Sequence, residues 1–279
     1  MIVEAAPAKL NLDLLVTGRR ADGYHLLDSF VTFLDQGDRL SLAPAAALRL
    51  DVVGATAADL PVGEENIVLR AARGLAALAG HPPAAAIILD KRLPVAAGIG
   101  GGSADAAATL RGLCRLWRVA PPPAALAELA LGLGADVPVC LAGQPARMQG
   151  IGERIEPCTL PALDLVLVNP RLPLATAAVF KALDRSRCGP RPSGQAPATA
   201  WRASRNDLEP AARALLPVID AALAALAAAP GCTLARMSGS GPTCFGLFPD
   251  RSAALAAATA LQAAQPGWWV VACRSLAAP

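Results

Sequence analysis

The sequence predicts an α+β protein with two lobes, and three observations support this prediction. Residues 1–60 are dominated by segments that alternate between apolar and polar side chains, as half-buried strands do. Later in the chain, short apolar runs are separated by stretches with helical spacing, which indicates helices layered on sheets. The 279 residues suffice for two modest domains, and the composition changes near residues 150–152. We therefore expect one domain over residues 1–152 and a second over residues 153–279.

The first domain is expected to begin with strands. Period-two alternation predicts strands over residues 10–15, 30–34 and 48–53, with turns at residues 22–23 and 36–37. Apolar side chains at helical spacing predict a helix over residues 66–78, which Gly80 ends. A strand over 84–89, a glycine-rich loop and helices over 104–116 and 126–133 follow, and the last helix stops at residues 134–136.

The second domain is expected to alternate strands with helices. Apolar runs predict strands over residues 163–168, 244–248 and 268–273, and helical spacing predicts helices over 176–183, 210–229 and 252–264. Residues 184–203 are rich in proline, arginine and serine, which predicts a mobile loop with no assignable role.

Composition excludes several classes of protein. The net charge of +3 is too small to indicate a nucleic-acid partner. Hydrophobic residues make up 54% of the chain, but alanine supplies much of this fraction. The sequence contains no run of 18 strongly apolar residues, which a membrane-spanning helix would need. The N-terminus shows no signal-peptide pattern. We expect a cytoplasmic protein that binds neither nucleic acid nor membrane.

The cysteines and histidines indicate no metal centre. The seven cysteines form no Cys-x-x-Cys pair and mostly lie among apolar residues, as small buried side chains in a reducing compartment do. The two histidines, His25 and His81, are far apart in the sequence, which argues against a zinc site.

Residues 94–105 form the most informative segment, because four of the five residues from Gly98 to Gly102 are glycine. A strand, a glycine-rich loop and a helix start can cradle phosphate, since glycine lets the backbone approach an oxyanion and the helix start presents free amide groups. The alternative is a flexible turn capped by Ser103. The segment matches neither a Walker loop, nor a dinucleotide fingerprint, nor a nucleophile elbow, so its companions in the chain must identify it.

Three segments together resemble the motifs of the GHMP small-molecule kinases, in order and in spacing. They are Ala-Pro-Ala-Lys-Leu-Asn-Leu at residues 6–12, the glycine segment at 94–105, and Met-Ser-Gly-Ser-Gly-Pro-Thr at 237–243. The resemblance covers nearly the whole chain. Residues 17–27, 65–66, 134–138 and 205–209 narrow it to the GHMP kinases that act on 4-diphosphocytidyl-2-C-methyl-D-erythritol, and Gly23-Tyr24-His25 is the most specific of these segments.

The resemblance implies a two-lobed GHMP kinase fold, with an N-terminal lobe similar to domain 2 of ribosomal protein S5 and a ferredoxin-like C-terminal lobe. It implies that a monomer or weak homodimer transfers the γ-phosphoryl group of ATP to the 2-hydroxyl of the erythritol unit, in the non-mevalonate route to isoprenoids. Mg²⁺ would be carried by ATP, with Ser103 as a candidate ligand and no dedicated metal site. The residues expected to bind ATP are Asn66, Lys91, Pro94, Val95, Ala96, Ala97, Gly98, Ile99, Gly100, Gly101, Gly102, Ser103 and Ala104.

The resemblance also assigns a catalytic pair, Lys9 and Asp136. Asp136 would accept the proton of the alcohol, and the ammonium of Lys9 would keep that carboxylate ionised and orient the hydroxyl. The alternative for Asp136 is an N-cap of a helix that starts near Pro138. The alternative for Lys9 is a surface lysine at the start of a strand.

The remaining expected contacts are with the substrate. Tyr24 would stack on the cytosine ring and His25 would hydrogen-bond its edge, whereas the alternative is a loop tyrosine packed on the core. Asn11 would contact the substrate beside Lys9. Ser238 and Gly239 would close the site from a second glycine turn, for which a plain hairpin turn is the alternative. Two side chains have capping as an alternative to ligand contact: Asn66, which could touch adenine, and Asp105.

Two rival interpretations stay open at this point. A GHMP kinase for another alcohol, such as homoserine or mevalonate, would have no base to stack on Tyr24. A nucleotide-binding module without catalysis would have no need of both Lys9 and Asp136.

Overall fold

The computed structural model describes residues 1–60, 63, 65–191 and 197–276, which form two compact units. Unit 1 comprises residues 1–8, 36–95 and 100–143, and unit 2 comprises residues 9–35, 96–99 and 144–279. The units therefore alternate along the chain. A single boundary near residue 152 does not separate them, because residues 9–35 group with the C-terminal part of the chain.

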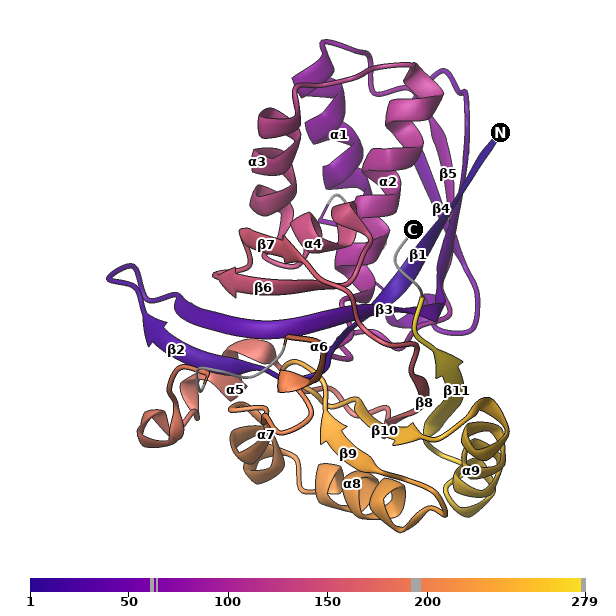
Figure 1. Ribbon diagram of the computed structural model, residues 1–279. Helices are drawn as coiled ribbons and strands as arrows, with labels where there is room; N and C mark the ends of the chain where they lie inside the picture. The colour runs from indigo at the N-terminus through magenta and orange to yellow at the C-terminus, as the bar shows by residue number, and fades with distance from the viewer. Residues whose placement is uncertain (61–62, 64, 192–196, 277–279) are drawn as a thin grey trace. The chain divides into compact units, whose positions relative to one another are not determined.

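Unit 1 is a sheet with helices on one face (Figure 1). Its strand order is β4-β5-β3, with β1 also paired to β3; β5 is antiparallel to β3 and parallel to β4. The strands are β1 (Ile2–Asn11), β3 (His25–Ala43), β4 (Arg49–Val53) and β5 (Ala86–Asp90), of which β1 and β3 continue into unit 2. The helices are η1 (Ala57–Asp59), α1 (Ile67–Ala79), α2 (Gly101–Trp117), α3 (Pro123–Leu133) and α4 (Val137–Ala142).

Local sequence accounts for most of these elements. The side chain of Asn66 accepts a hydrogen bond from the amide of Val68 and begins α1, and Gly80 ends that helix in the left-handed conformation with φ of +61°. In β5, Ile87 and Leu89 are buried whereas Ile88 is 43% exposed, as period-two alternation requires. The helices and strands predicted for this unit from residue 48 onward are confirmed, although α2 and α3 each begin three residues earlier than expected.

The turn predicted at residues 36–37 is wrong. Gln36 and Gly37 lie within β3, which runs without interruption from His25 to Ala43. A Cβ atom on Gly37 would collide with the backbone of Ala6 in β1. The glycine therefore permits a close approach of two strands rather than a change of direction.

Unit 2 contains two groups of strands. The first part of β3 pairs with β2 (Leu15–Arg19) and β6 (Ala146–Gly150), and β6 pairs with β7 (Arg154–Pro157). A four-stranded antiparallel sheet has the order β11-β8-β10-β9, with β8 (Asp164–Asn169), β9 (Leu234–Met237), β10 (Cys244–Phe248) and β11 (Trp269–Arg274). The helices are α5 (Thr176–Lys181), η2 (Arg185–Arg187), α6 (Pro197–Ala200), α7 (Glu209–Leu215), α8 (Val218–Ala228) and α9 (Arg251–Ala264).

The core of unit 2 lies on the four-stranded sheet. Helices α8 and α9 pack against it (Figure 1), and every residue of β8 and β10 is buried. The strands predicted over 163–168, 244–248 and 268–273 and the helix predicted over 252–264 are confirmed to within one residue. The pair β6–β7 was not predicted, because two short strands with arginine and glutamate in them carry little apolar signal.

The prediction of one helix over residues 210–229 is wrong in one respect, because the segment forms two helices. Helix α7 ends at Leu215, and α8 begins after Pro217, which occupies its N-cap position. Proline lacks the amide that a continuing helix needs, and its ring disfavours the helical conformation of the residue before it. The alanine-rich composition on both sides hid this interruption.

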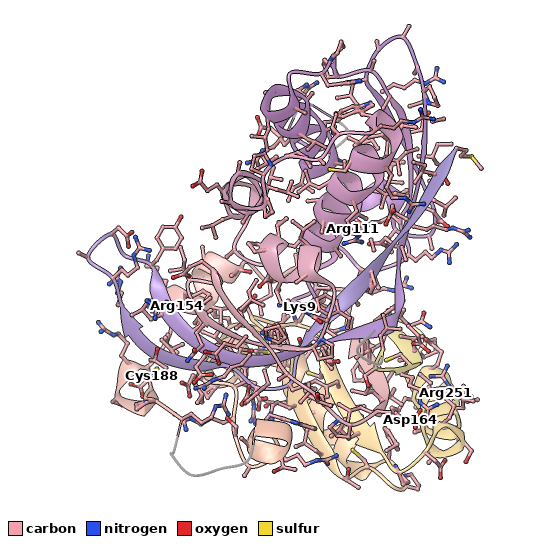
Figure 2. The ribbon with its side chains drawn as sticks, turned by 45° about the horizontal axis from the view of Figure 1, so that its top comes forward. Lys9, Arg111, Arg154, Asp164, Cys188 and Arg251 are labelled. Atoms are coloured by element: carbon pink, nitrogen blue, oxygen red, sulfur yellow. The ribbon has the colours of Figure 1, made fainter. Side chains whose placement is uncertain are left out.

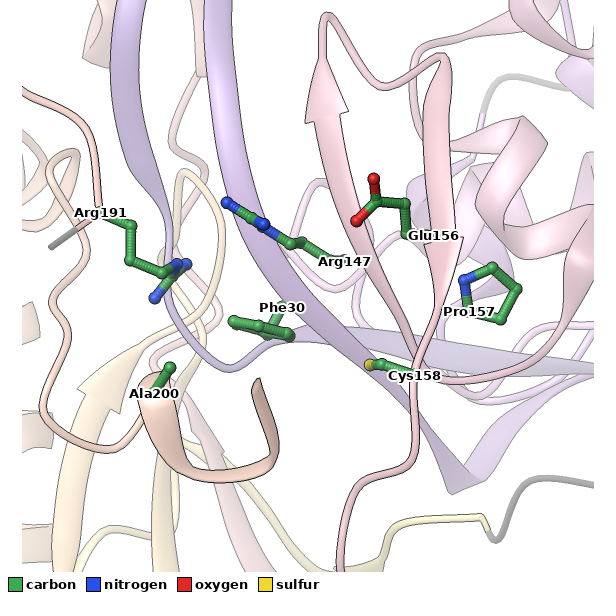
Figure 3. A pocket seen from close by; sticks show the side chains of 7 residues that line it. All are labelled: Phe30, Arg147, Glu156, Pro157, Cys158, Arg191 and Ala200. Atoms are coloured by element: carbon green, nitrogen blue, oxygen red, sulfur yellow. The ribbon is translucent and has the colours of Figure 1, made fainter. Parts of the chain in front are cut away.

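The segment predicted as a mobile loop, residues 184–203, is ordered by packing where the structure describes it. Trp201 is fully buried, and the Arg191 guanidinium lies 4.7 Å from the centre of the Phe30 ring (Figure 3). Arg191 also forms a 2.5 Å ion pair with Asp13, a residue with no exposed surface. Residues 192–196 of this prediction lie outside the described part. Arg191 and Phe30 line a small cavity of about 180 Å³.

Candidate active site

The start of α2 has the properties of an anion site. Gly100 occupies the N-cap position with φ of +65°, and no side chain in the described chain caps the helix. The first turn also carries no acidic residue. Its amide groups and the positive end of the helix dipole are thus left for a ligand. Since the helix already begins at Gly101, the alternative of a turn capped by Ser103 is wrong.

The preceding part of the glycine segment is shaped by close backbone contact. Gly98 has φ of +72°, and a Cβ atom there would lie 2.5 Å from the carbonyl oxygen of Gly241. A Cβ on Gly239, whose φ is +55°, would lie 2.8 Å from the carbonyl oxygen of Gly98. Only glycine fits both positions. The turn that joins β9 to β10 is a hairpin connection, and it also packs directly on the glycine segment.

Parts of all three segments of the resemblance, residues 9–12, 96–99 and 237–243, meet in unit 2. The backbone amide of Lys9 donates a 2.9 Å hydrogen bond to the carbonyl of Ile99. The amide of Asn11 donates to the Ser238 hydroxyl at 3.1 Å, and that hydroxyl donates to the carbonyl of Gly98 at 3.2 Å. Residues about 90 positions apart are therefore joined by a main-chain hydrogen bond, and residues about 230 positions apart by a hydrogen bond from a backbone amide to a side-chain hydroxyl.

Lys9 is not a surface lysine. The residue, which is labelled in Figure 2, is only 2% exposed. Its ammonium donates a 2.6 Å hydrogen bond to the Asn11 side-chain oxygen, and the Asn11 amide donates to the Ser29 hydroxyl at 2.7 Å. This chain of hydrogen bonds fixes the position of the ammonium, so one role of Asn11 is to orient Lys9.

Asp136 lies between α3 and α4, where Gly134 ends one helix and Pro138 lies in the first turn of the next. It occupies the N-cap position of α4, but its carboxylate makes no capping hydrogen bond within the described chain. The N-cap position expected for Asp136 is confirmed, although among the described residues its side chain does not cap the helix. Its role as the base that accepts the alcohol proton stays a prediction.

Tyr24 and His25 differ sharply in their surroundings. Tyr24 is 60% exposed, so the alternative of a tyrosine packed on the core is wrong. The His25 ring stacks on Phe180 of α5, with ring centres 4.9 Å apart and an angle of 23° between the planes. Partial burial and the charges of Arg19 and Arg185 lower the pKa of His25, which favours the neutral imidazole near pH 7. Phe180 was not predicted as a partner of His25, because nothing in the helix pattern marks it.

Three further side chains, Asn66, Lys91 and Asp105, are candidate contacts of the nucleotide or candidate helix caps. The capping role of Asn66 is confirmed, and its contact with adenine stays a prediction. Lys91 is 1% exposed, and its ammonium donates to the carboxylates of Asp105, at 2.7 Å, and Asp38. Its ammonium is therefore engaged by two carboxylates inside unit 1, and a contact of Lys91 with ATP stays a prediction. Asp105 is not a cap, because it lies buried within α2.

A further motif of the sequence holds the β9–β10 turn. The side-chain amide of Asn206 donates to the carbonyls of Met237, at 2.9 Å, and Gly239. The Glu209 carboxylate accepts a 3.0 Å hydrogen bond from the amide of Met237. Asn206 and Glu209 belong to the segment 205–209, whose sequence alone predicts no role for it.

The described residues contain no group of three or more histidine, cysteine, aspartate or glutamate side chains that could hold a metal ion. All seven cysteines are free thiols. Among the helices of the described chain, none is long and apolar enough to cross a membrane.

Family models identify the class of protein. The model for the GHMP kinase N-terminal domain matches residues 66–144, and the model for the GHMP kinase C-terminal domain matches residues 198–267. Together they match more than half of the chain, and the chain belongs to the GHMP kinases. The predicted two-lobed α+β GHMP kinase fold is confirmed.

Close relatives narrow the family. A 4-diphosphocytidyl-2-C-methyl-D-erythritol kinase of Paramagnetospirillum magneticum is 57% identical over 95% of both chains, and one of Rhodospirillum rubrum is 53% identical over 98% of this chain and 92% of the relative. The crystal structure of a 4-(cytidine 5'-diphospho)-2C-methyl-D-erythritol kinase aligns with a TM-score of 0.84 and 35% identity, covering 98% of this chain and 99% of that one. Within the GHMP kinases, the chain belongs to the family of these relatives.

Proposed function

We propose that this chain transfers the γ-phosphoryl group of ATP to the 2-hydroxyl of 4-diphosphocytidyl-2-C-methyl-D-erythritol, in the non-mevalonate route to isoprenoid precursors. The observation that carries the proposal is the near full-length match to a relative of that name at 57% identity. The reaction needs a place for the triphosphate, a group that takes the hydroxyl proton and a site that recognises cytidine. Each of these requirements has a counterpart among the described residues.

The start of α2 is the proposed triphosphate site. Its uncapped amide groups and positive helix end would hold the phosphate oxygens, and Gly98 lets the backbone approach them. Mg²⁺ would neutralise charge on the phosphates when bound. The half-buried hydroxyl of Ser103 is the candidate protein ligand, and the lack of an acidic cluster among the described residues fits an ion that keeps several waters and is held mainly by ATP.

Asp136 is the proposed acceptor of the hydroxyl proton. As the alkoxide character of the 2-hydroxyl develops, the carboxylate takes the proton and the oxygen attacks the γ-phosphorus of ATP; the bond from that phosphorus to the leaving ADP oxygen breaks. Lys9, fixed by Asn11, would hold the hydroxyl by its charge and stabilise the attacking oxygen. Neither step needs a covalent enzyme intermediate.

The Tyr24–His25 segment is the proposed cytidine site. An exposed tyrosine ring offers a face on which a pyrimidine can stack, and a neutral imidazole can both donate to and accept from the edge of the base. Phe180 supports His25 by stacking on it. The proposed substrates are small water-soluble metabolites, and we propose a cytoplasmic enzyme that works as a monomer or weak homodimer.

The proposal is tested by offering Mg-ATP with a panel of alcohols and following the release of ADP. The panel contains 4-diphosphocytidyl-2-C-methyl-D-erythritol, the same erythritol unit without the cytidyl diphosphate, homoserine and mevalonate. We expect rapid release of ADP with the first alcohol only. Preference for homoserine or mevalonate would assign the chain to another GHMP activity, and binding of ATP without turnover of any alcohol would indicate a module that has lost catalysis.

A further inference from the structure

Lys91 is one of only three lysines in the chain, and it is deeply buried. Its ammonium donates a 2.7 Å hydrogen bond to Asp105 and a second, short one to Asp38, and both carboxylates are 2% exposed or less. Burying three ionisable groups is costly unless they are closely paired, so this arrangement is not a by-product of packing apolar residues.

The three residues join three elements of unit 1. Asp38 belongs to β3, Lys91 follows β5 and Asp105 lies in α2. The second carboxylate oxygen of Asp38 accepts hydrogen bonds from the amides of Arg92, at 2.6 Å, and Leu93, at 2.8 Å. Asp38 thus holds the chain that leads from β5 toward the glycine segment, while Lys91 connects it to the helix that follows that segment.

The first turn of α2 rests directly on this cluster. A Cβ atom on Gly101 would lie 3.3 Å from the Lys91 ammonium nitrogen and 3.7 Å from a carboxylate oxygen of Asp38. The amide groups proposed to hold the triphosphate belong to this same turn. A shift of the ammonium would therefore move those amides.

The charge of the cluster also suits a phosphate site above it. Burial, together with the Asp38 carboxylate, raises the pKa of Asp105 to about 7 against the opposing effect of Lys91. One Asp105 oxygen has no hydrogen-bond partner among the described residues. Burial lowers the pKa of Lys91, but the two carboxylates outweigh this and raise it overall. Near pH 7 a pKa of about 7 leaves Asp105 about half protonated, so the ammonium, the Asp38 carboxylate and Asp105 together carry less than one net negative charge to repel phosphate.

We propose that Asp38, Lys91 and Asp105 form a buried clamp that fixes the first turn of α2, so that Lys91 is a positioning residue for the triphosphate and not a ligand of it. The inference rests on the proposed function in that it takes the start of α2 as the site of ATP. It assigns a purpose to a lysine that the family resemblance alone placed among the ATP contacts.

The test measures the affinity of the full chain for Mg-ATP and for ADP by direct titration in three variants. Lys91→Met removes the ammonium. Asp105→Leu keeps the ammonium, paired with Asp38, but cuts its link to α2. Asp105→Asn keeps an acceptor oxygen for Lys91. Lys181→Met, which alters an exposed lysine of α5, is the matched control.

We expect Lys91→Met and Asp105→Leu each to lower the affinity for Mg-ATP and for ADP by roughly 10- to 100-fold, because the binding amides are displaced. The double variant should bind nucleotide no more weakly than the worse single variant, since both substitutions break the same connection between Lys91 and α2. Asp105→Asn and Lys181→Met should stay within about threefold of the wild type. Affinity for the cytidyl substrate should not change, a pattern that general loss of structure would not produce.

Two results would overturn the clamp. If Lys91→Met weakens Mg-ATP but Asp105→Leu does not, Lys91 contacts the nucleotide directly. If neither variant changes nucleotide affinity, the cluster has no part in positioning α2. Should Lys91→Met fail to fold, Asp105→Leu still decides, because its remaining charges are balanced. Failure of the wild-type chain to bind Mg-ATP would instead refute the proposed function, and the clamp with it.

Discussion

The side-chain amide of Asn206 donates a 2.8 Å hydrogen bond to the carbonyl oxygen of Gly239. Gly239 belongs to the turn that packs against Gly98, so Asn206 supports the glycine segment from a distance of more than 100 residues in sequence. Its side-chain oxygen accepts separately from the amide of Leu208 at the start of α7. Asn206 therefore fastens a turn and a helix start with one side chain.

Replacing Asn206 by aspartate should loosen the turn selectively. Asn206→Asp keeps the acceptor for Leu208 but removes the donor from two buried carbonyls, each of which costs about 1–3 kcal/mol when left unpaired. We expect a lower free energy of unfolding in denaturant titrations and turnover reduced by at least roughly tenfold from the misplaced turn. A variant with the wild-type denaturation midpoint and turnover would show that the turn holds itself.

Asp136→Asn tests the proposed base. Asparagine keeps the shape of the side chain but cannot accept the proton, so turnover should fall by roughly 10²- to 10⁴-fold while Mg-ATP still binds. Asp220→Asn, on the exposed side of α8, is a matched control that should leave turnover unchanged. Near-normal turnover of Asp136→Asn would remove this residue from the mechanism.

Tyr24→Ala should lower the affinity for the cytidyl substrate by roughly tenfold or more, because stacking on an aromatic ring contributes about 1–3 kcal/mol per base. Mg-ATP affinity should not change. Tyr24→Phe retains the ring and should bind the substrate almost as the wild type does. Equal losses for both ligands in Tyr24→Ala, or no loss at all, would argue against the stacking role; calorimetric titration measures both affinities.

Two glycine variants separate folding from binding. Gly98→Ala places a methyl group against the Gly241 carbonyl at an unfavourable φ of +72°, and we expect it to destabilise the chain by at least roughly 2 kcal/mol. Gly102→Ala meets only Ile67, at 3.9 Å, within a helix, so stability should hold or rise by up to about 1 kcal/mol. The added methyl group should nonetheless lower the affinity for Mg-ATP, because it hinders the approach of phosphate oxygens to the backbone amides. Unchanged nucleotide affinity of Gly102→Ala would exclude the start of α2 as the triphosphate site.

The raised pKa of Asp105 predicts a specific pH dependence of stability. Between about pH 4 and pH 7 the folded chain keeps a proton on Asp105, with its pKa of about 7, that the unfolded chain has released, so the free energy of unfolding falls as the pH rises. Asp105→Asn cannot show this effect. The wild type should therefore lose up to roughly 4 kcal/mol relative to the variant across this window, as measured by denaturant titration. A relative stability that stays flat or rises would contradict the buried, protonated state.

Local pattern was enough for much of the fold. Asn66 and Gly80 mark both ends of α1, and the apolar runs of β8 and β10 are buried along their whole length, so these elements were predictable. The errors arise where a non-local contact decides the outcome. Gly37 looks like a turn residue, but it is a glycine because β1 passes close by, and the described part of 184–203 is held by Trp201 and Arg191.

The same distinction applies to the site. The spacing of the glycines indicated a phosphate cradle, because the ability of the backbone to approach an anion depends on the local sequence. The partners of Lys91, by contrast, come from β3 and α2, and the partner of His25 comes from α5. No local spacing predicts which distant side chain will meet a given lysine or imidazole.

The most direct test of the central claim is the phosphorus NMR spectrum of the product formed from Mg-ATP and 4-diphosphocytidyl-2-C-methyl-D-erythritol. Carbon 2 of this substrate bears a methyl group and no hydrogen, so transfer to its hydroxyl should add one phosphomonoester signal without three-bond coupling to a proton. A new signal split by carbinol protons would place the phosphoryl group on another hydroxyl, and the absence of any new signal would contradict the kinase assignment itself.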